Sequence, residues 1–356
     1  MLVGRRALVG LAIASALIGC APPPPPPPPP KPVVVGPPTD TVKIPLTDLL
    51  ARTYYGNSGG LYPGGINQPP TEHDSVARAR RNLIKPLDVN GDESPFGKYV
   101  LLSIGMSNAT QEWCSQNSGP PCAPWTFMGK AATDPTINHY SLVIVNGAAD
   151  GQDAPAWISP SSASYDRIKL GRLAPLGLSE NQVQAVWVKL DDQKPSVSLP
   201  GDSADAKVLL TNLGLVLRAL RVRYPYLRLV FLSSRIYGGY ATTDLNPEPY
   251  AYESGFSVKW LIESQINEMR GLPPNPRVGS LNYTSKAAPL ILWGPYMWAN
   301  GTTARSDGLS WERADFEEDG MHPSQSGEAK VSQRLIDFFK NSPYTRCWFV
   351  TSGYCL

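Results

Sequence analysis

The sequence has little net charge and few residues that could bind a transition metal. Its 356 residues include 32 Lys and Arg against 30 Asp and Glu, which leaves a formal charge of +2. A nucleic-acid-binding face would show as a concentration of basic residues, and this balance gives no sign of one. Only three His and five Cys are present, and the His residues are scattered along the chain. We therefore expect neither a nucleic-acid partner nor a metal site.

Long apolar runs are also missing, apart from one at the start of the chain. Two Arg residues precede the apolar stretch 7–19, which is too short to span a bilayer but has the length of an export signal. The stretch ends in the letters LIGC at Cys20, which resembles a bacterial lipoprotein signal. The resemblance implies that residues 1–19 are removed and that Cys20 carries a lipid anchor in the cell envelope. Because Ala21 is not Asp, it also implies sorting to the outer membrane. A cleaved secretory signal with a chance Cys is the alternative.

An unbroken proline run, Pro22–Pro30, follows the expected anchor. Proline fixes φ and has no backbone N–H, so the run predicts a polyproline II rod that reaches roughly 28 Å. We assign residues 20–40 to a tether that holds the rest of the protein away from the membrane. A ligand for a proline-recognition domain is the alternative.

The four remaining cysteines form two pairs of equal spacing. Seven residues separate Cys114 from Cys122, and seven separate Cys347 from Cys355. An exported chain is in an oxidising compartment, where nearby cysteines pair. We predict the local disulfides Cys114–Cys122 and Cys347–Cys355, in preference to a zinc site.

From residue 97 onward, short apolar runs alternate with helical patterns. Five of the runs predict buried strands, at 99–104, 141–146, 184–188, 227–233 and 290–293. Apolar residues at helical spacing predict helices at about 209–220, 253–269 and 331–339. Strands that alternate with helices indicate a parallel sheet with helices on both faces. We expect an α/β fold, a flavodoxin-like three-layer α/β/α sandwich with a five-stranded parallel sheet.

This domain is placed at residues 97–341. A loop-rich extension is expected before it at 41–96, and a disulfide-closed tail after it at 342–356. In such sheets, ligands bind outside the carboxyl ends of the strands. The residues that directly follow each strand are therefore the candidates for a site.

A serine follows the first expected strand, in the segment Gly105-Met106-Ser107-Asn108. The glycine lets the chain turn sharply, so that the hydroxyl of Ser107 can face the mouth of the sheet. Taken alone, this motif favours a helix N-cap, because Ser and Asn are common there.

A second motif, DGMHPS at 319–324, precedes the last expected helix. The carboxylate of Asp319 is three residues before His322 and can orient its imidazole ring. The other ring nitrogen is then free to take the proton of a serine hydroxyl. A plain turn before the helix is the alternative. Together the motifs predict a triad of Ser107, His322 and Asp319.

The two motifs, in this order and on these elements, resemble the SGNH hydrolase superfamily of GDSL-like esterases, nearest to the sialate O-acetylesterase and acetylxylan esterase type. The resemblance covers residues 97–341 through short motifs. It implies a nucleophilic Ser107, a small-molecule or carbohydrate acyl ester as substrate, and no cofactor.

The resemblance also implies hydrogen-bond donors for an oxyanion after the second and third strands. Gly151 matches the first donor, with Gly147 as the fallback and a plain turn as the alternative. The Asn expected after the third strand is absent. Lys189 lies in that neighbourhood and could act there as a point charge.

A loop rich in Gly and Tyr follows the fourth expected strand, which suggests a pocket for a sugar or another polar substrate. Arg235, Tyr237 and Glu253 are candidate contacts, together with Asn108 beside the serine. In the alternative, the tyrosines pack the loop and Arg235 pairs with Glu253.

The sequence thus predicts an exported, lipid-anchored serine esterase. An O-acyltransferase that acts on envelope polysaccharide remains open. So does a non-catalytic binding lipoprotein with the same fold, because the usual donor after the third strand is missing.

Overall fold

The computed structural model describes residues 39–114 and 120–353. The export signal, Cys20 and the proline run lie outside the described residues, and so does Cys355 with its expected disulfide. The described residues belong to one compact unit. Among their helices, none is long and apolar enough to cross a membrane.

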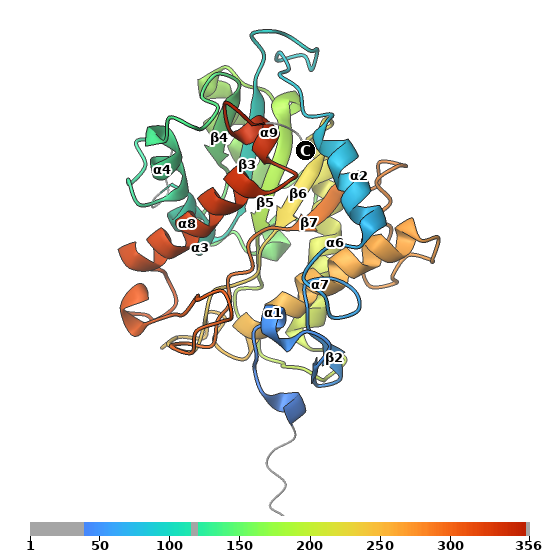
Figure 1. The fold of residues 1–356 in the computed structure, drawn as a ribbon, viewed down its shortest axis with the longest axis vertical. Helices are drawn as coiled ribbons and strands as arrows, with labels where there is room; N and C mark the ends of the chain where they lie inside the picture. Colours follow the sequence, from blue (N-terminus) through green and yellow to red (C-terminus); the bar gives the residue numbers. More distant parts are fainter. Residues whose placement is uncertain (1–38, 115–119, 354–356) are drawn as a thin grey trace, which may run out of the picture. The chain divides into compact units, whose positions relative to one another are not determined.

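A five-stranded parallel sheet forms the centre of this unit (Figure 1). The strands are β3 (Tyr99–Gly105), β4 (Leu142–Asn146), β5 (Val183–Lys189), β6 (Leu229–Leu232) and β7 (Leu290–Trp293). They lie in the order β4-β3-β5-β6-β7, and each neighbouring pair is parallel. Numbered along the chain this order is 2-1-3-4-5, which is the flavodoxin-like arrangement. The predicted fold class is confirmed, and each expected strand is present within three residues of its predicted ends.

Alternation along the strands divides the core into two layers. Successive side chains of a strand point to opposite faces, so Leu102 and Val186 enter one hydrophobic cluster while Leu101 and Trp187 enter the other. Helices cover both faces, which explains why all residues of β3, β5, β6 and β7 are buried.

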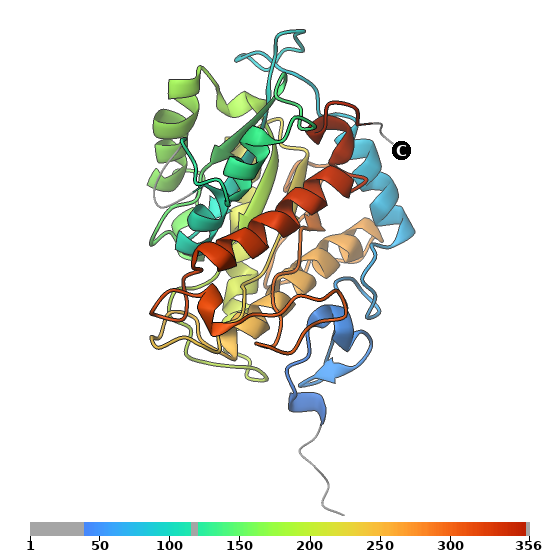
Figure 2. The ribbon, with the colours of Figure 1, turned by 60° about the vertical axis from the view of Figure 1, so that its left-hand side comes forward.

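The helices are distributed over the two faces (Figures 1 and 2). Buried side chains of one cluster come from α1 (Leu46–Leu49), α5 (Ala163–Ile168), α6 (Asp205–Arg223) and α7 (Tyr250–Met269). Those of the other come from α2 (Thr71–Arg81), α3 (Ser107–Trp113), α4 (Phe127–Thr133), α8 (Gln325–Asn341) and α9 (Arg346–Phe349). The three helices predicted from apolar periodicity correspond to α6, α7 and α8.

The segment before the sheet is more ordered than the sequence indicated. It contains α1, the two-stranded hairpin β1 (Thr53–Tyr54) and β2 (Asn57–Ser58), and the 11-residue helix α2. Helix α2 escaped prediction because its sequence is mostly polar and charged and only a narrow side of it is buried.

The segment after the last long helix also joins the core. In α9 the side chains of Trp348 and Phe349 are buried, and the hydroxyl of Tyr99 donates to the carbonyl of Trp348 at 2.6 Å. The predicted disulfide Cys114–Cys122 is present, at the end of α3.

Candidate active site

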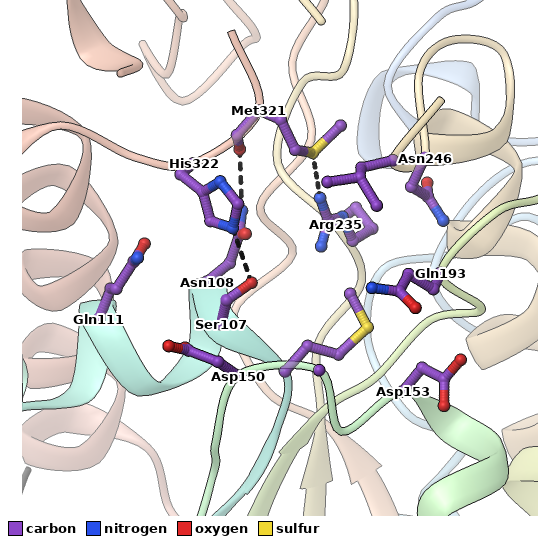
Figure 3. A pocket seen from close by; sticks show the side chains of 13 residues that line it. Ser107, Asn108, Gln111, Asp150, Asp153, Gln193, Arg235, Asn246, Met321 and His322 are labelled. Carbon is purple, nitrogen blue, oxygen red and sulfur yellow. Dashed lines mark hydrogen bonds between the residues drawn. The ribbon is translucent and has the colours of Figure 1, made fainter. Parts of the chain in front are cut away.

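The structure brings together the three residues of the predicted triad (Figure 3). The hydroxyl of Ser107 lies 2.8 Å from Nε2 of His322, and Nδ1 of the same ring lies 2.5 Å from Oδ2 of Asp319. Ser107 follows β3 and the other two residues lie in the loop before α8, so both segments are at the carboxyl edge of the sheet. The serine and the histidine are 215 residues apart in the chain.

Asp319 is fixed by its own loop. Its Oδ1 accepts hydrogen bonds from the backbone N–H groups of Met321 at 2.9 Å and His322 at 3.0 Å. Partial burial would raise the pKa of Asp319, but these two N–H groups and the imidazole outweigh it and hold the pKa below its usual value. An ionised carboxylate only accepts, so Nδ1 of His322 carries the ring proton and Nε2 presents a lone pair to Ser107.

Two glycines allow the loops of the site to form. Gly320 has φ +66°, and a Cβ there would be 1.8 Å from the carbonyl oxygen of Tyr240. A Cβ on Gly105 would be 2.7 Å from the carbonyl oxygen of Lys189. Any other residue would therefore displace the backbone at the start of the serine turn or inside the Asp–His loop.

The serine does not act as a helix cap. Met106 is the N-cap residue of α3 and Ser107 is the first residue of the helix, with its hydroxyl turned to His322. Its backbone N–H belongs to the first turn, where no intrahelical acceptor exists. That N–H is consequently available to a bound ligand.

A cavity of about 390 Å³ opens beside Ser107 and His322. Its lining comes from the first turns of α3 with the residue before it and from the loops after β4, β5 and β6 and before α8. It comprises Met106, Ser107, Asn108, Gln111, Asp150, Gly151, Asp153, Gln193, Arg235, Leu245, Asn246, Met321 and His322. No group of three or more His, Cys, Asp or Glu side chains within residues 39–114 and 120–353 could hold a metal ion.

Of the predicted oxyanion donors, Gly151 lies at the cavity and the others do not. The fallback, Gly147, donates its N–H to the hydroxyl of Ser103 at 3.1 Å and is already engaged. The expectation for Lys189 is wrong. Its side chain is 1% exposed, it does not line the cavity, and its ammonium group pairs with the carboxylate of Glu112 on α3.

Lys189 and Glu112 form a buried ion pair between the end of β5 and α3, the helix that begins at Ser107. Burial lowers the pKa of Lys189 and raises that of Glu112, and each charge partly offsets the shift of the other. The pair joins the end of β5 to α3, and it supports the segment that carries Ser107.

Two of the four predicted substrate contacts line the cavity. Asn108 is 2% exposed, and its Nδ2 donates to the carbonyl of Met321 at 3.1 Å, which ties the serine turn to the histidine loop. Arg235 is 3% exposed, and a terminal nitrogen of its guanidinium contacts the sulfur of Met321. Figure 3 shows its head group between Ser107 and Asn246.

The other two predicted contacts are elsewhere. Tyr237 packs against Tyr240 and Trp298 and is not part of the cavity lining. Glu253 is buried on α7, where it accepts from the hydroxyl of Tyr54 at 3.0 Å and from the N–H of Leu199 at 2.9 Å. It therefore forms no pair with Arg235 either. Tyr237 lies in the loop after β6 and Glu253 in the first turn of α7, but the packing of each side chain directs it away from the cavity.

Five polar lining residues were not predicted as part of the site: Gln111, Asp150, Asp153, Gln193 and Asn246. Gln111 is one helical turn after Ser107, so it lies on the same side of α3. That spacing is a signal that could have identified it. The other four are in irregular loops, where sequence periodicity does not indicate which way a side chain points.

No protein-family model matches the sequence, and no curated protein matches it. Matches exist among solved structures. A carbohydrate acetylesterase from Sinorhizobium meliloti is 12% identical, over 67% of this chain and 97% of that chain, with a TM-score of 0.37. An extracellular lipase from Streptomyces rimosus is 14% identical, over 67% and 98%, with a TM-score of 0.32. A salicylyl-acyltransferase from a tetracycline biosynthetic pathway is 15% identical, over 71% and 58%, with a TM-score of 0.33. At these values the matches carry no conclusion about activity or substrate.

Proposed function

We propose that this protein is a serine esterase that hydrolyses acyl esters of carbohydrates or similar polar alcohols. The observation that carries the proposal is the continuous hydrogen-bonded chain from Ser107 through His322 to Asp319, at the wall of a cavity. A nucleophile, a base within hydrogen-bond reach and a group that orients the base are the requirements of acyl transfer through a covalent intermediate.

In the first half of the reaction, Oγ of Ser107 attacks the ester carbonyl while Nε2 of His322 takes its proton. The imidazolium then gives that proton to the alkoxide that leaves, and an acyl-serine remains. In the second half, His322 takes a proton from water while the hydroxide attacks the acyl group. The imidazolium then returns that proton to Oγ of Ser107 as the acyl–serine bond breaks, and the acid is released. Asp319 stays ionised throughout and stabilises the imidazolium.

Two backbone N–H groups can receive the oxyanion of the tetrahedral intermediate. One is that of Ser107 at the start of α3, and the other is that of Gly151, which also lines the cavity. Oxyanion donors act best when they are already in place before the reaction, as backbone groups are.

The location is part of the proposal. We infer export and lipid attachment at Cys20 from the LIGC segment and the basic, apolar start of the chain. In a two-membrane bacterium the outer membrane would be the destination. The proline run would keep the cavity away from the membrane surface.

The nucleophile is tested by Ser107→Ala, with Ser234→Ala as the matched control. Ser234 is buried and its hydroxyl has no hydrogen-bond partner among the described residues, so its loss should be nearly neutral. On p-nitrophenyl acetate, Ser107→Ala should lower kcat by a factor on the order of 10⁶. It should also abolish labelling by a fluorophosphonate. An active, folded Ser107→Ala variant would refute the assignment. Acyl transfer to an added polysaccharide, in place of free acid, would indicate a transferase.

A further inference from the structure

A second cavity, of about 60 Å³, lies at the edge of the sheet opposite to the serine. Arg228 directly precedes β6 and Leu290 begins β7, so the cavity is at the amino ends of these strands, whereas Ser107 follows the carboxyl end of β3. The described residues that line it include no acidic side chain and four basic ones, namely Arg80, Arg221, Arg228 and Lys286. This is a local concentration of positive charge in a chain whose formal charge is only +2.

None of these four basic side chains forms an ion pair with a described residue. Arg80 and Arg221 donate hydrogen bonds to backbone carbonyls, those of Tyr283 at 3.4 Å and of Tyr224 at 3.3 Å. A carbonyl is a neutral acceptor, so it leaves the charge of the guanidinium uncompensated. Arg228 lies over the ring of Tyr226 at 5.8 Å and donates no side-chain hydrogen bond within the described part of the chain.

The three guanidinium groups of the cavity repel one another. Burial lowers the pKa of Arg228, and the positive charges of Arg80 and Arg221 lower it further. Burial and the charge of Arg80 likewise lower the pKa of Arg221. Like charges at this separation disfavour each other's charged state, and an anion bound between them would relieve that repulsion.

Stabilisation of helix ends explains only part of the cluster. Arg80 lies in the last turn of α2 and Arg221 in the last turn of α6, where a positive charge is favourable to the helix dipole. Arg228 and Lys286 lie outside the helices. Lys286 also has φ +63°, a conformation that is unfavourable for a residue other than glycine. The helix dipole therefore does not account for a basic residue at either of these two positions.

The size and the charge of the cavity indicate the kind of anion that fits it. About 60 Å³ is room for a few water molecules, and so for a group of the size of phosphate but not for a sugar ring. Guanidinium groups bind phosphate oxygens through paired N–H donors, and several cations around one cavity suit a dianion better than a carboxylate. The Nε of Arg228 is covered by the protein, whereas its two terminal nitrogens remain accessible to a ligand.

We propose that this cavity binds the phosphate monoester group of a second ligand, held by Arg228 and Lys286 with Arg80 and Arg221 beside them. The cavity takes the phosphate group itself, and the rest of the ligand lies outside it. Because the serine is at the opposite edge of the sheet, both sites can be occupied at once. The inference does not depend on the esterase function proposed above.

Calorimetric titration of the full chain at low ionic strength provides the first test. The probes are inorganic phosphate, glucose 6-phosphate and acetate. We expect saturable binding of the two phosphates with similar Kd, and a Kd for acetate at least about tenfold higher. Binding of glucose 6-phosphate should weaken as the pH falls from about 7.5 to about 5, because its phosphate loses one of its two charges.

Two outcomes of this titration would overturn the inference. Equal Kd values for acetate and phosphate would mean that the basic cluster attracts anions without a built site. Retention of the protein on vesicles that contain phosphatidate, without binding of either soluble phosphate, would mean that it recognises an extended anionic surface and not one group in a cavity.

The second test compares Arg228→Gln with Arg277→Gln. Arg277 is exposed, is absent from the lining of this cavity and donates to the carbonyl of Asp202 at 3.2 Å, so its replacement removes the same charge elsewhere. Arg228→Gln should raise the Kd for phosphate at least about tenfold, and the control should leave it unchanged. Phosphate should raise the thermal midpoint of the wild type and of the control, but not that of Arg228→Gln.

Lys286→Gln gives the same test at an exposed side chain, where a substitution does not disturb the packing. It should also raise the Kd for phosphate. Equal phosphate affinity in the wild type, Arg228→Gln and Lys286→Gln would overturn the inference.

Discussion

Replacement of Asp319 by Asn should inactivate the protein through the proton on His322. In the wild type, Oδ1 of Asp319 accepts from two backbone N–H groups and Oδ2 accepts from Nδ1 of His322. An Asn side chain has one oxygen, and the two backbone donors of its own loop hold that oxygen in the Oδ1 position. The amide NH₂ then faces Nδ1, which must become an acceptor. The ring proton moves to Nε2, and the base facing Ser107 is lost.

The expected loss follows from that tautomer. The same change in a serine protease triad lowers kcat by about 10⁴, which is about 5.5 kcal/mol in the activation barrier. The fold should be unaffected, because the substituted side chain would keep both hydrogen bonds that Asp319 accepts from the backbone of its loop.

The assay is the steady-state hydrolysis of p-nitrophenyl acetate at neutral pH, with Asp150→Asn as the control. Asp150 lines the same cavity but forms no side-chain hydrogen bond with a described residue, so its change should alter kcat by less than about tenfold. Nitrogen NMR of the imidazole should place the proton on Nε2 in Asp319→Asn. A folded Asp319→Asn variant with activity close to that of Asp150→Asn would refute the reasoning.

Three further predictions concern stability. Lys189→Met should lower the free energy of unfolding by about 3–5 kcal/mol in urea, because it leaves Glu112 buried and unpaired, and Glu112→Gln in the same chain should restore part of it. Burial raises the pKa of Glu253 to about 7 from 4.5, so the folded protein binds more protons than the unfolded one between these values. The free energy of unfolding of the wild type should therefore fall by up to about 3 kcal/mol, relative to that of Glu253→Gln, as the pH rises from 4.5 to 7. A difference between the two proteins that does not change with pH would contradict this. Replacing both Cys114 and Cys122 by Ser should lower the free energy of unfolding by roughly 2–3 kcal/mol. An unchanged thermal midpoint of the double variant would show that the disulfide does not stabilise the fold.

Much of the sheet was predictable from the sequence because its strands are buried on both faces. Such strands read as short apolar runs, and the alternation with helices implies the parallel sheet. The triad was predictable because two local motifs carry it: a serine directly after the first strand of the sheet, and an Asp and a His three residues apart before the last long helix. Helix α2 was missed, because its stability comes from packing on the core and not from a periodic apolar face.

The side chains that surround the triad were harder to predict. Lys189 and Glu253 are at the expected ends of their elements, yet each has a buried partner that turns it away from the cavity. These partners, Glu112 and Tyr54, are 77 and 199 residues distant in the chain. Pairings over such separations depend on the complete tertiary structure, and a single sequence gives no sign of them.

The hydrogen bond from Asn108 to the carbonyl of Met321 spans 213 residues, and that from Ser107 to His322 spans 215. Neither hydrogen bond can form until β3 and β7 have joined the sheet and α8 has packed against it, because the bonds join the start of α3 to the loop before α8. Contacts of such long range form late, because closing the intervening chain opposes them entropically. Recovery of ester hydrolysis during refolding should consequently lag behind far-ultraviolet circular dichroism and coincide with the return of tryptophan fluorescence, which would make the activity itself a probe of the last folding step.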